Sequence, residues 1–243
     1  MEAKRKIDWT TISSIIEENS EVKTFLLDCP EDFTWDEGAH THFALEGFNA
    51  GDKPNRSLVR HMSISTLPVE GKIGITTRIK AQCSEFKTIL KGMQAGDKVA
   101  LFKTHTNVPL FEEGKPLYLL SSGVGLATFR SVALKYLNND TNVPSVHSLN
   151  VDSSEQYLFT DIFRDNEAKN FTASFVPTRD AYYAEVEKLA QNTDALFYVV
   201  GSDEFLMQNI AILRRAGVPV ANIKLDKHAQ FTDKFFNEIV AQA

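Results

Sequence analysis

Residues 117–130 read LYLLSSGVGLATFR, and this stretch decides how the second half of the chain folds. A short apolar strand runs into two glycines separated by one residue, and a helical segment begins near Thr128. Glycine lets the backbone approach a ligand, and the start of a helix offers N–H groups and a positive dipole end to a phosphate. Thr128 stands where a third glycine would complete a dinucleotide motif, so a plain glycine turn of an α/β domain remains an equal alternative.

The residues after this stretch alternate between apolar strands and helical segments. We expect strands at residues 146–151, 171–176, 195–200 and 223–225, and helices at 128–137, 182–191, 204–216 and 231–240. Apolar strands that alternate with helices indicate a parallel sheet with crossover connections. The predicted second domain is therefore an α/β nucleotide-binding domain that spans residues 114–243.

The residues before this stretch follow a different pattern, in which short alternating runs are separated by turn residues. They predict antiparallel strands at residues 12–16, 22–27, 40–45, 61–65, 73–79 and 98–102. One helix interrupts them, capped by Ser84 and with Phe86, Ile89, Leu90 and Met93 on its apolar face. Six short strands with one helix indicate a small barrel over residues 1–113. The predicted fold class is an antiparallel β-barrel followed by a parallel-sheet α/β domain.

The composition excludes several classes of protein. The 243 residues carry 26 basic and 32 acidic side chains, and a net charge of -6 argues against nucleic acid or an anionic membrane as the main partner. The two cysteines, Cys29 and Cys83, form no CxxC motif, which excludes a zinc ribbon, a four-thiolate cluster and a disulfide framework. The first residues lack the apolar run of a signal peptide, and the longest uncharged run, 116–130, is too short to span a bilayer. We expect a cytoplasmic protein.

A second motif lies in the predicted barrel, where residues 59–68 read VRHMSISTLP. Arg60 and Ser63 are three residues apart in a strand, so their side chains point to opposite faces. One of them could hold a phosphate while the other meets a flat ring. Taken one by one, such residues are common in barrel strands and identify nothing.

Taken in order and spacing, the motifs make the chain resemble the ferredoxin–NADP reductase superfamily, in its stand-alone form. The superfamily's Arg-x-aromatic-Ser flavin motif is similar to residues 60–63, and its pyrophosphate-binding helix start is similar to Cys83-Ser84, with Thr77-Arg78 on the preceding strand. Its glycine-rich nucleotide motif is similar to residues 122–131. Its late Gly-Pro-Pro motif is similar to residues 201–205, and its terminal acid-x-aromatic motif to residues 226–228. The resemblance covers nearly the whole chain.

The resemblance implies FAD and a nicotinamide nucleotide, NADH or NADPH, as cofactors. Arg60 would grip the flavin phosphates, Ser63 would donate a hydrogen bond near flavin N5, and Gly201 would let the nicotinamide approach. The implied catalytic residues are Ser63 and His228. The implied cofactor contacts are Arg60, His61, Met62, Ser63, Thr76, Thr77, Arg78, Cys83, Ser84, Gly123, Val124, Gly125, Leu126, Ala127, Asp152, Gly201, Ser202, Asp203 and Phe205. The flavin carries the chemistry, so no side chain needs to act as an acid or a base.

The chain also departs from the superfamily's pattern. Met62 replaces the aromatic residue that stacks on the flavin, Ala127-Thr128 replaces Thr-Pro, and Ser202-Asp203 replaces Pro-Pro. His228 stands where an aromatic residue often shields the flavin. Each departure weakens one contact. Asp152, at the end of the strand 146–151, would accept from ribose hydroxyls and repel a 2′-phosphate, which favours NADH over NADPH.

The implied activity is that of a flavoprotein oxidoreductase, which takes hydride from NAD(P)H into bound FAD. Its electrons would pass to a separate acceptor, either a ferredoxin-like or flavodoxin-like protein or a small molecule. Two alternatives remain: a reductase of free flavin, which the loose contact at Met62 would suit, and a non-catalytic binding module on the same scaffold. His40 and His42 share a strand face, but no third ligand lies near in sequence, so we expect no metal site there.

Overall fold

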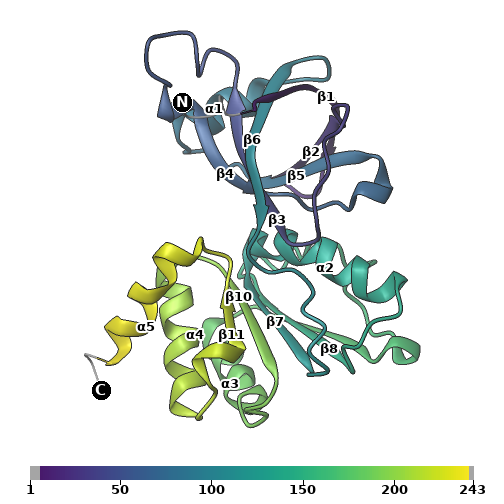
Figure 1. Cartoon of the computed structure of the whole chain (residues 1–243), viewed down its shortest axis with the longest axis vertical. Helices are drawn as coiled ribbons and strands as arrows, with labels where there is room; N and C mark the ends of the chain where they lie inside the picture. The colour runs from purple at the N-terminus through teal and green to yellow at the C-terminus, as the bar shows by residue number, and fades with distance from the viewer. Residues whose placement is uncertain (1–5, 241–243) are drawn as a thin grey trace. The chain divides into compact units, whose positions relative to one another are not determined.

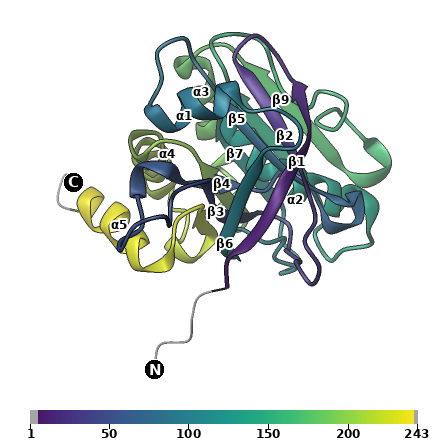
Figure 2. The ribbon, with the colours of Figure 1, turned by 90° about the horizontal axis from the view of Figure 1, so that it is seen from above.

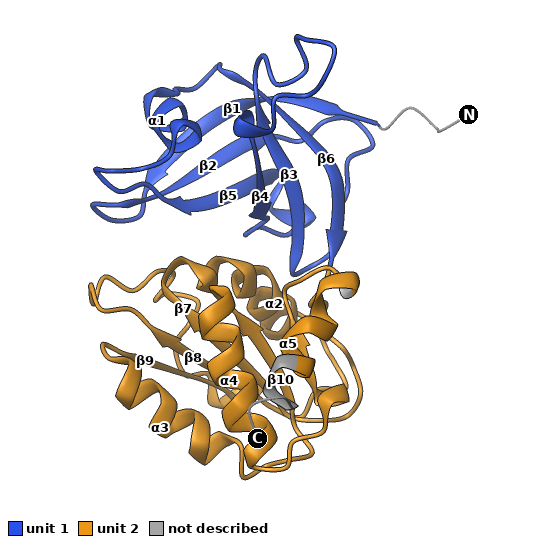
Figure 3. Cartoon of the chain, turned by 90° about the vertical axis from the view of Figure 1, so that its left-hand side faces the viewer, with its two compact units in different colours: residues 1–106 blue, residues 107–243 orange. Residues whose placement is uncertain are grey.

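The computed structural model describes residues 6–240 and divides the chain into two compact units (Figure 3). Unit 1 comprises residues 1–106 and unit 2 residues 107–243. The sequence places the boundary after residue 113, whereas the structure assigns the segment from Asn107 onward to unit 2. Two hydrogen bonds explain the difference. The Phe111 N–H donates to Tyr198 Oη at 3.1 Å, and the Asn107 amide donates to Asp226 at 3.0 Å.

Unit 1 is an antiparallel sheet of six strands in the order β4-β3-β6-β1-β2-β5, curled around its core (Figures 1 and 2). The strands are β1 (Asp8–Glu17), β2 (Val22–Asp28), β3 (Ala39–Leu45), β4 (Val59–Ser63), β5 (Lys72–Arg78) and β6 (Lys98–Thr106). The predicted barrel is confirmed as an open half-barrel whose edge strands are β4 and β5. A bridge between Ile64 and Ile75 joins these two edges just beyond the end of β4.

Helix α1 (Glu85–Gly92) covers the core of unit 1. Ser84 forms its N-cap, and Phe86 and Leu90 are fully buried among side chains of the strands, such as Phe43 and Ile75. The apolar spacing seen in the sequence is therefore the reason that the helix docks on the sheet. Its docking brings the first turn of α1 beside Arg60 of β4, whose guanidinium lies 5.1 Å from the centre of the Phe86 ring.

Unit 2 contains a parallel sheet of five strands in the order β11-β10-β7-β8-β9. The strands are β7 (Leu117–Ser122), β8 (Val146–Val151), β9 (Phe171–Val176), β10 (Leu196–Val200) and β11 (Ile223–Leu225). The helices are α2 (Leu126–Asn138), α3 (Arg179–Leu189), α4 (Asp203–Arg215) and α5 (Thr232–Val240). The predicted parallel sheet is confirmed. Because β7 lies between β8 and β10, the order of the strands reverses at β7, and this switch point is where parallel sheets bind ligands.

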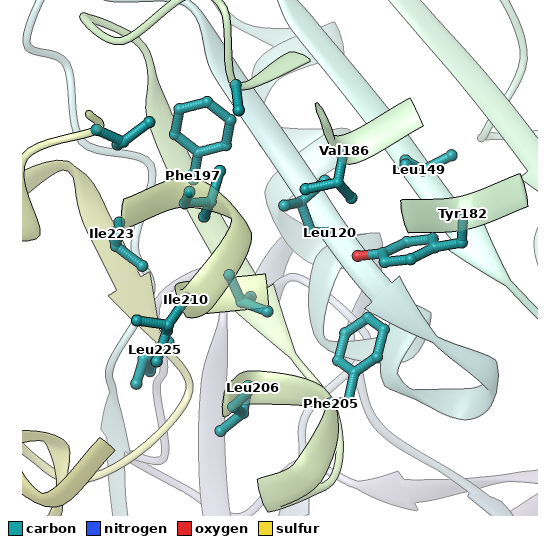
Figure 4. Packing of buried hydrophobic residues seen from close by; sticks show 14 of the residues in the cluster. Leu120, Leu149, Tyr182, Val186, Phe197, Phe205, Leu206, Ile210, Ile223 and Leu225 are labelled. Carbon is teal, nitrogen blue, oxygen red and sulfur yellow. The ribbon is translucent and has the colours of Figure 1, made fainter. Parts of the chain in front are cut away.

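The core of unit 2 joins the sheet to helices α3 and α4 (Figure 4). Leu120 and Phe197 come from the strands, Tyr182 from α3, and Phe205 and Ile210 from α4, all without measurable exposure. The Tyr182 hydroxyl donates to Asn209 Oδ1 at 3.0 Å, so this buried polar group is satisfied. Within residues 6–240, no helix has both the length and the apolar character that a membrane span requires.

Candidate functional site

The glycine loop after β7 lies at the switch point of the unit 2 sheet. It forms a short 3-10 turn, Gly123–Gly125, that leads into α2. A Cβ atom on Gly125 would lie 3.1 Å from the carbonyl oxygen of Val200, at the end of the neighbouring strand β10. Asn150 of β8 fixes the loop from the other side, because its amide donates to Ser121 Oγ at 2.8 Å and to the Gly123 carbonyl at 3.3 Å. Sequence reasoning did not single out Asn150.

The start of α2 presents backbone groups, while two of the predicted contact residues turn their side chains inward. No side chain caps this helix end. Leu126 and Ala127 are buried in the core, and Val124 is half-buried. Leu126 and Ala127 can therefore contribute only backbone N–H groups to a ligand, which is the usual way in which a helix start binds phosphate.

The loop after β10 carries Gly201 and adjoins the glycine loop, because β10 pairs with β7. A Cβ atom on Gly201 would overlap the ring of Phe205. Phe205 itself has no exposure, and the Arg179 guanidinium lies 4.9 Å from the centre of its ring. The structure therefore places Phe205, a predicted cofactor contact, in the core beneath the loop, where its ring packs under Gly201. Ser202 caps α4, with its hydroxyl accepting from the Phe205 N–H at 3.3 Å.

Asp203 is tied to the C-terminal part of unit 2. Its carboxylate pairs with Lys227 at 2.8 Å and with Lys234 of α5 at 3.3 Å. The hydrogen bond from Lys227 is the main cause that holds the pKa of Asp203 below its usual value. The acidic residue of this loop is thus matched by two lysines. His228 follows β11 and is exposed, and its Nδ1 accepts from the Gln230 N–H at 3.4 Å.

Asp152 begins the loop that follows β8. The side chain is 5% exposed, and its Oδ1 accepts from the Ser154 N–H at 2.9 Å and from the Ser154 hydroxyl at 2.7 Å. This arrangement is an Asx turn, in which an aspartate fixes the backbone that follows it. The carboxylate therefore has a structural role in the loop, and its predicted role toward a ribose stays a prediction.

In unit 1, the flavin-like motif lies on the edge strand β4. Arg60 Nη1 donates to three backbone carbonyls of its own turn: Arg56 at 3.3 Å, Ser57 at 3.1 Å and Val59 at 2.7 Å. Arg60 forms no ion pair with any described side chain, so its charge is unmatched. Met62 packs partly against the core, and Ser63 is half-buried at the end of the strand, opposite His40.

The threonines of β5 are engaged inside the sheet. Thr76 Oγ1 lies 2.7 Å from Thr24 Oγ1 and 3.0 Å from Ser65 Oγ, and the side chain is 7% exposed. Thr77 Oγ1 accepts from Lys87 Nζ, which also donates to the Arg78 carbonyl at 2.7 Å. Both predicted threonine contacts thus use their hydroxyls to join β5 to its neighbours. Any contact of theirs with a ligand would come from the backbone of this edge strand.

The segment before α1 leads to a group of positive charges. Ser84 is exposed and its side chain makes no capping hydrogen bond, while Cys83 Sγ lies 3.6 Å from Thr88 Oγ1. Sequence reasoning missed Lys87, which lies in the first turn of α1. Burial is the main cause that lowers the pKa of Lys87 to about 8; Cys83 raises it in part, and Arg60 adds the smallest of the three effects by lowering it. Arg60 and Lys87 therefore place two cations near a helix start that has no side-chain capping hydrogen bond, an arrangement that could bind an anion.

The structure gathers four histidines on one face of β3, β4 and β6. The ring centres of His42 and His61 lie 4.0 Å apart, as do those of His40 and His105, and His40 lies 5.8 Å from His61. His61, a predicted cofactor contact, belongs to this cluster. The sequence placed only His40 and His42 together, because the other two come from different strands. Across the described residues, no group of three or more His, Cys, Asp or Glu side chains could hold a metal ion.

Solved structures share this arrangement of half-barrel and parallel sheet. A ferredoxin NADP+ reductase from Neisseria gonorrhoeae, described with bound FAD and NADP, superposes with a TM-score of 0.76, covering 91% of this chain and 98% of its own at 16% sequence identity. The chain has the ferredoxin reductase-like fold. No protein-family model matches the sequence, and no curated protein matches it either.

Two other proteins with the ferredoxin reductase-like fold extend the comparison. A cytochrome P450 reductase from Amycolatopsis has a TM-score of 0.74 at 17% identity, with 92% of this chain and 71% of that one covered. The CS-b5R domains of human Ncb5or, in the NAD+ form, have a TM-score of 0.73 at 17% identity, with 93% and 71% covered. At these identities the likeness establishes the fold, and the roles of residues rest on their own geometry.

Proposed function

We propose that the chain is an FAD-dependent NAD(P)H oxidoreductase that passes electrons to a separate acceptor. The observation that carries the proposal is the pair of unmatched cations, Arg60 and Lys87, at the uncapped start of α1. They lie on the half-barrel of a ferredoxin reductase-like fold, and several proteins with this fold are described with FAD or a nicotinamide nucleotide. A dianionic pyrophosphate matches both charges and the N–H groups of the helix start.

The residues of unit 1 fit a flavin. Arg60 and the Ser84 end of α1 would hold its phosphates, and the edge strand β4 would lie along its ring system. Met62 would offer a polarisable thioether contact in place of aromatic stacking, and the Ser63 hydroxyl would donate near N5. When bound, the flavin supplies the hydride-accepting chemistry, and the protein supplies binding and orientation.

The residues of unit 2 fit a nicotinamide nucleotide. The backbone N–H groups at Gly123–Gly125 and the start of α2 would bind its pyrophosphate, and Gly201 would leave room for the nicotinamide. The pairing of Asp203 with two lysines removes much of the repulsion that an acid in this loop would exert on a phosphate. We propose NADH as the preferred donor because an acidic residue, Asp152, directly follows β8.

The electrons would leave for a second molecule. With two cysteines in the sequence, no thiolate cluster of the four-cysteine kind can form within this chain. A ferredoxin-like or flavodoxin-like protein, or a small acceptor in the cytoplasm, would take them. One of the similar structures is named a cytochrome P450 reductase, and its shared fold supports a protein acceptor for this chain.

The visible spectrum of the purified protein tests the proposal, recorded without oxygen before and after addition of NADH or NADPH. We expect a flavin spectrum that NADH bleaches faster than NADPH. A colourless protein that consumes NADH only with added flavin would instead indicate a reductase of free flavin, since the loose contact at Met62 favours exchange. A bound flavin that neither nucleotide bleaches would overturn the proposal in favour of a binding module.

Replacing the thioether tests the flavin contact on β4. Met62→Tyr is expected to tighten FAD binding about two- to tenfold, because a stacked aromatic pair contributes about 0.5–1.5 kcal/mol beyond its buried area. Fluorescence titration of FAD against both proteins measures the change. Clear weakening would show that Met62 makes a contact that tyrosine does not reproduce.

A further inference from the structure

We infer that Lys87 is a second cationic ligand of the flavin phosphates, acting with Arg60, and that its protonation controls flavin affinity. The inference rests on the proposed function and adds a residue that the sequence motifs do not contain. Lys87 lies at the third position of α1, in the turn that begins at the Ser84 cap. Its ammonium group reaches β5, where it donates to Thr77 Oγ1 and to the Arg78 carbonyl.

Arg60 and Lys87 connect α1 to the two edge strands of the half-barrel. Arg60 comes from β4, and its guanidinium lies over Phe86, the residue that precedes Lys87 in the helix. Lys87 is bonded to β5, the other edge strand. The lowered pKa of Lys87 comes mainly from burial, and the nearby Arg60 adds the smallest of the three effects by disfavouring its charge.

Without an anion, the position of Lys87 is unfavourable for three separate reasons. A cation in the first turn of a helix opposes the helix dipole. The side chain is half-buried, so its charge loses hydration, and Arg60 repels it. Lys87 forms no ion pair with any described side chain, and its partners are a hydroxyl and a carbonyl. A bound phosphate would offset all three costs at once, since it supplies the missing negative charge.

The other lysine of α1 shows the contrast. Lys91 lies in the last turn, where a cation interacts favourably with the helix dipole, and it is exposed. Lys91 is therefore the matched control for Lys87, on the same helix and one turn further along.

The lowered pKa of Lys87 predicts the direction in which flavin affinity changes with pH. The groups that face Lys87 are Cys83 from the segment before α1, Arg60 from β4, and Thr77 with the Arg78 carbonyl from β5. With a pKa of about 8, Lys87 is charged at pH 7 and loses its proton above pH 8 in the flavin-free protein. A phosphate binds the charged form and raises this pKa. Flavin affinity should therefore be constant below about pH 7 and fall as the pH rises above about 8.

Fluorescence titration of FAD from about pH 6.5 to about pH 9.5 tests the inference on four proteins. The wild-type protein should lose about tenfold in affinity across this range. Lys87→Gln should bind FAD about tenfold more weakly than the wild-type protein at pH 7. The affinity of this variant should then change little as the pH rises. Lys87→Arg should keep most of the affinity and lose the pH dependence, because arginine stays charged. Lys91→Gln should follow the wild-type curve.

Riboflavin, which has no phosphate, separates phosphate binding from a merely structural role. We expect Lys87→Gln to leave riboflavin binding unchanged, and circular dichroism to report the same fold in each variant. Equal weakening of riboflavin and FAD would overturn the phosphate contact. An unchanged FAD affinity and pH curve in Lys87→Gln would overturn the inference while leaving the proposed function intact. Failure of the wild-type protein to bind FAD at all would overturn both.

Discussion

Arg60→Ala is expected to weaken FAD binding at least about a hundredfold, because two charge-assisted hydrogen bonds to phosphate are each worth about 1.5–3 kcal/mol. In the structure the guanidinium is oriented by three backbone carbonyls and by the Phe86 ring, without an ion pair among the described side chains. Alanine removes the cation and leaves β4 in place. The dissociation constant of FAD and the ratio of flavin to protein after gel filtration measure the loss.

Arg56→Ala is the matched control for this experiment. Arg56 belongs to the 3-10 turn (Arg56–Leu58) that directly precedes β4, carries the same charge as Arg60 and is exposed. It should retain full flavin occupancy, and its melting temperature should stay within a few degrees of the wild-type value, as is usual for surface changes. Full occupancy in Arg60→Ala would show that residues 60–63 do not form the flavin site.

The elements of the fold could be predicted because their signals are local. Alternating runs marked the strands of unit 1, and the apolar spacing of Phe86 and Leu90 marked α1. The order of the strands could not be predicted, since it depends on pairings between distant segments. Strand β1 pairs with β6, bringing Trp9 opposite Ala100, and no local pattern carries that information. The positions of β4 and β5 at the two ends of this order, beside the proposed flavin site, follow from these pairings.

The residues of the candidate site also fall into two groups, those that the sequence alone could suggest and those that only the folded structure brings together. Arg60 and the glycine loop lie in contiguous motifs, so the sequence alone could propose them. Lys87 could have been noticed as a cation in the first turn of a helix, against the dipole, but its neighbour Arg60 comes from another strand. The two lysines that pair with Asp203 come from the chain after β11, so the sequence suggested an unmatched acid. Phe205 was expected at the ligand, and its burial became visible only with α3 and α4 packed together.

Gly201→Ala is expected to slow the reduction of bound flavin by NADH about a hundredfold, since a displacement of about 1 Å at a reacting group can have an effect of that size. The added methyl group would overlap the ring of Phe205. That ring is fully buried against Tyr182, with ring centres 5.1 Å apart, so it has no room to move. The loop after β10 must shift instead, at the end of the sheet where the nicotinamide is proposed to bind.

Anaerobic stopped-flow absorbance of the flavin measures this rate, and titration confirms that FAD remains bound, because Gly201 belongs to unit 2 and Arg60 to unit 1. Gly92→Ala serves as the control. Gly92 ends α1, and a Cβ atom there would meet nothing within 4 Å. The same substitution made where there is room should leave the rate unchanged. If Gly201→Ala reduced its flavin as fast as the wild-type protein, the loop after β10 could not be the place where the nicotinamide approaches, and the assignment of Gly201 would have to be abandoned.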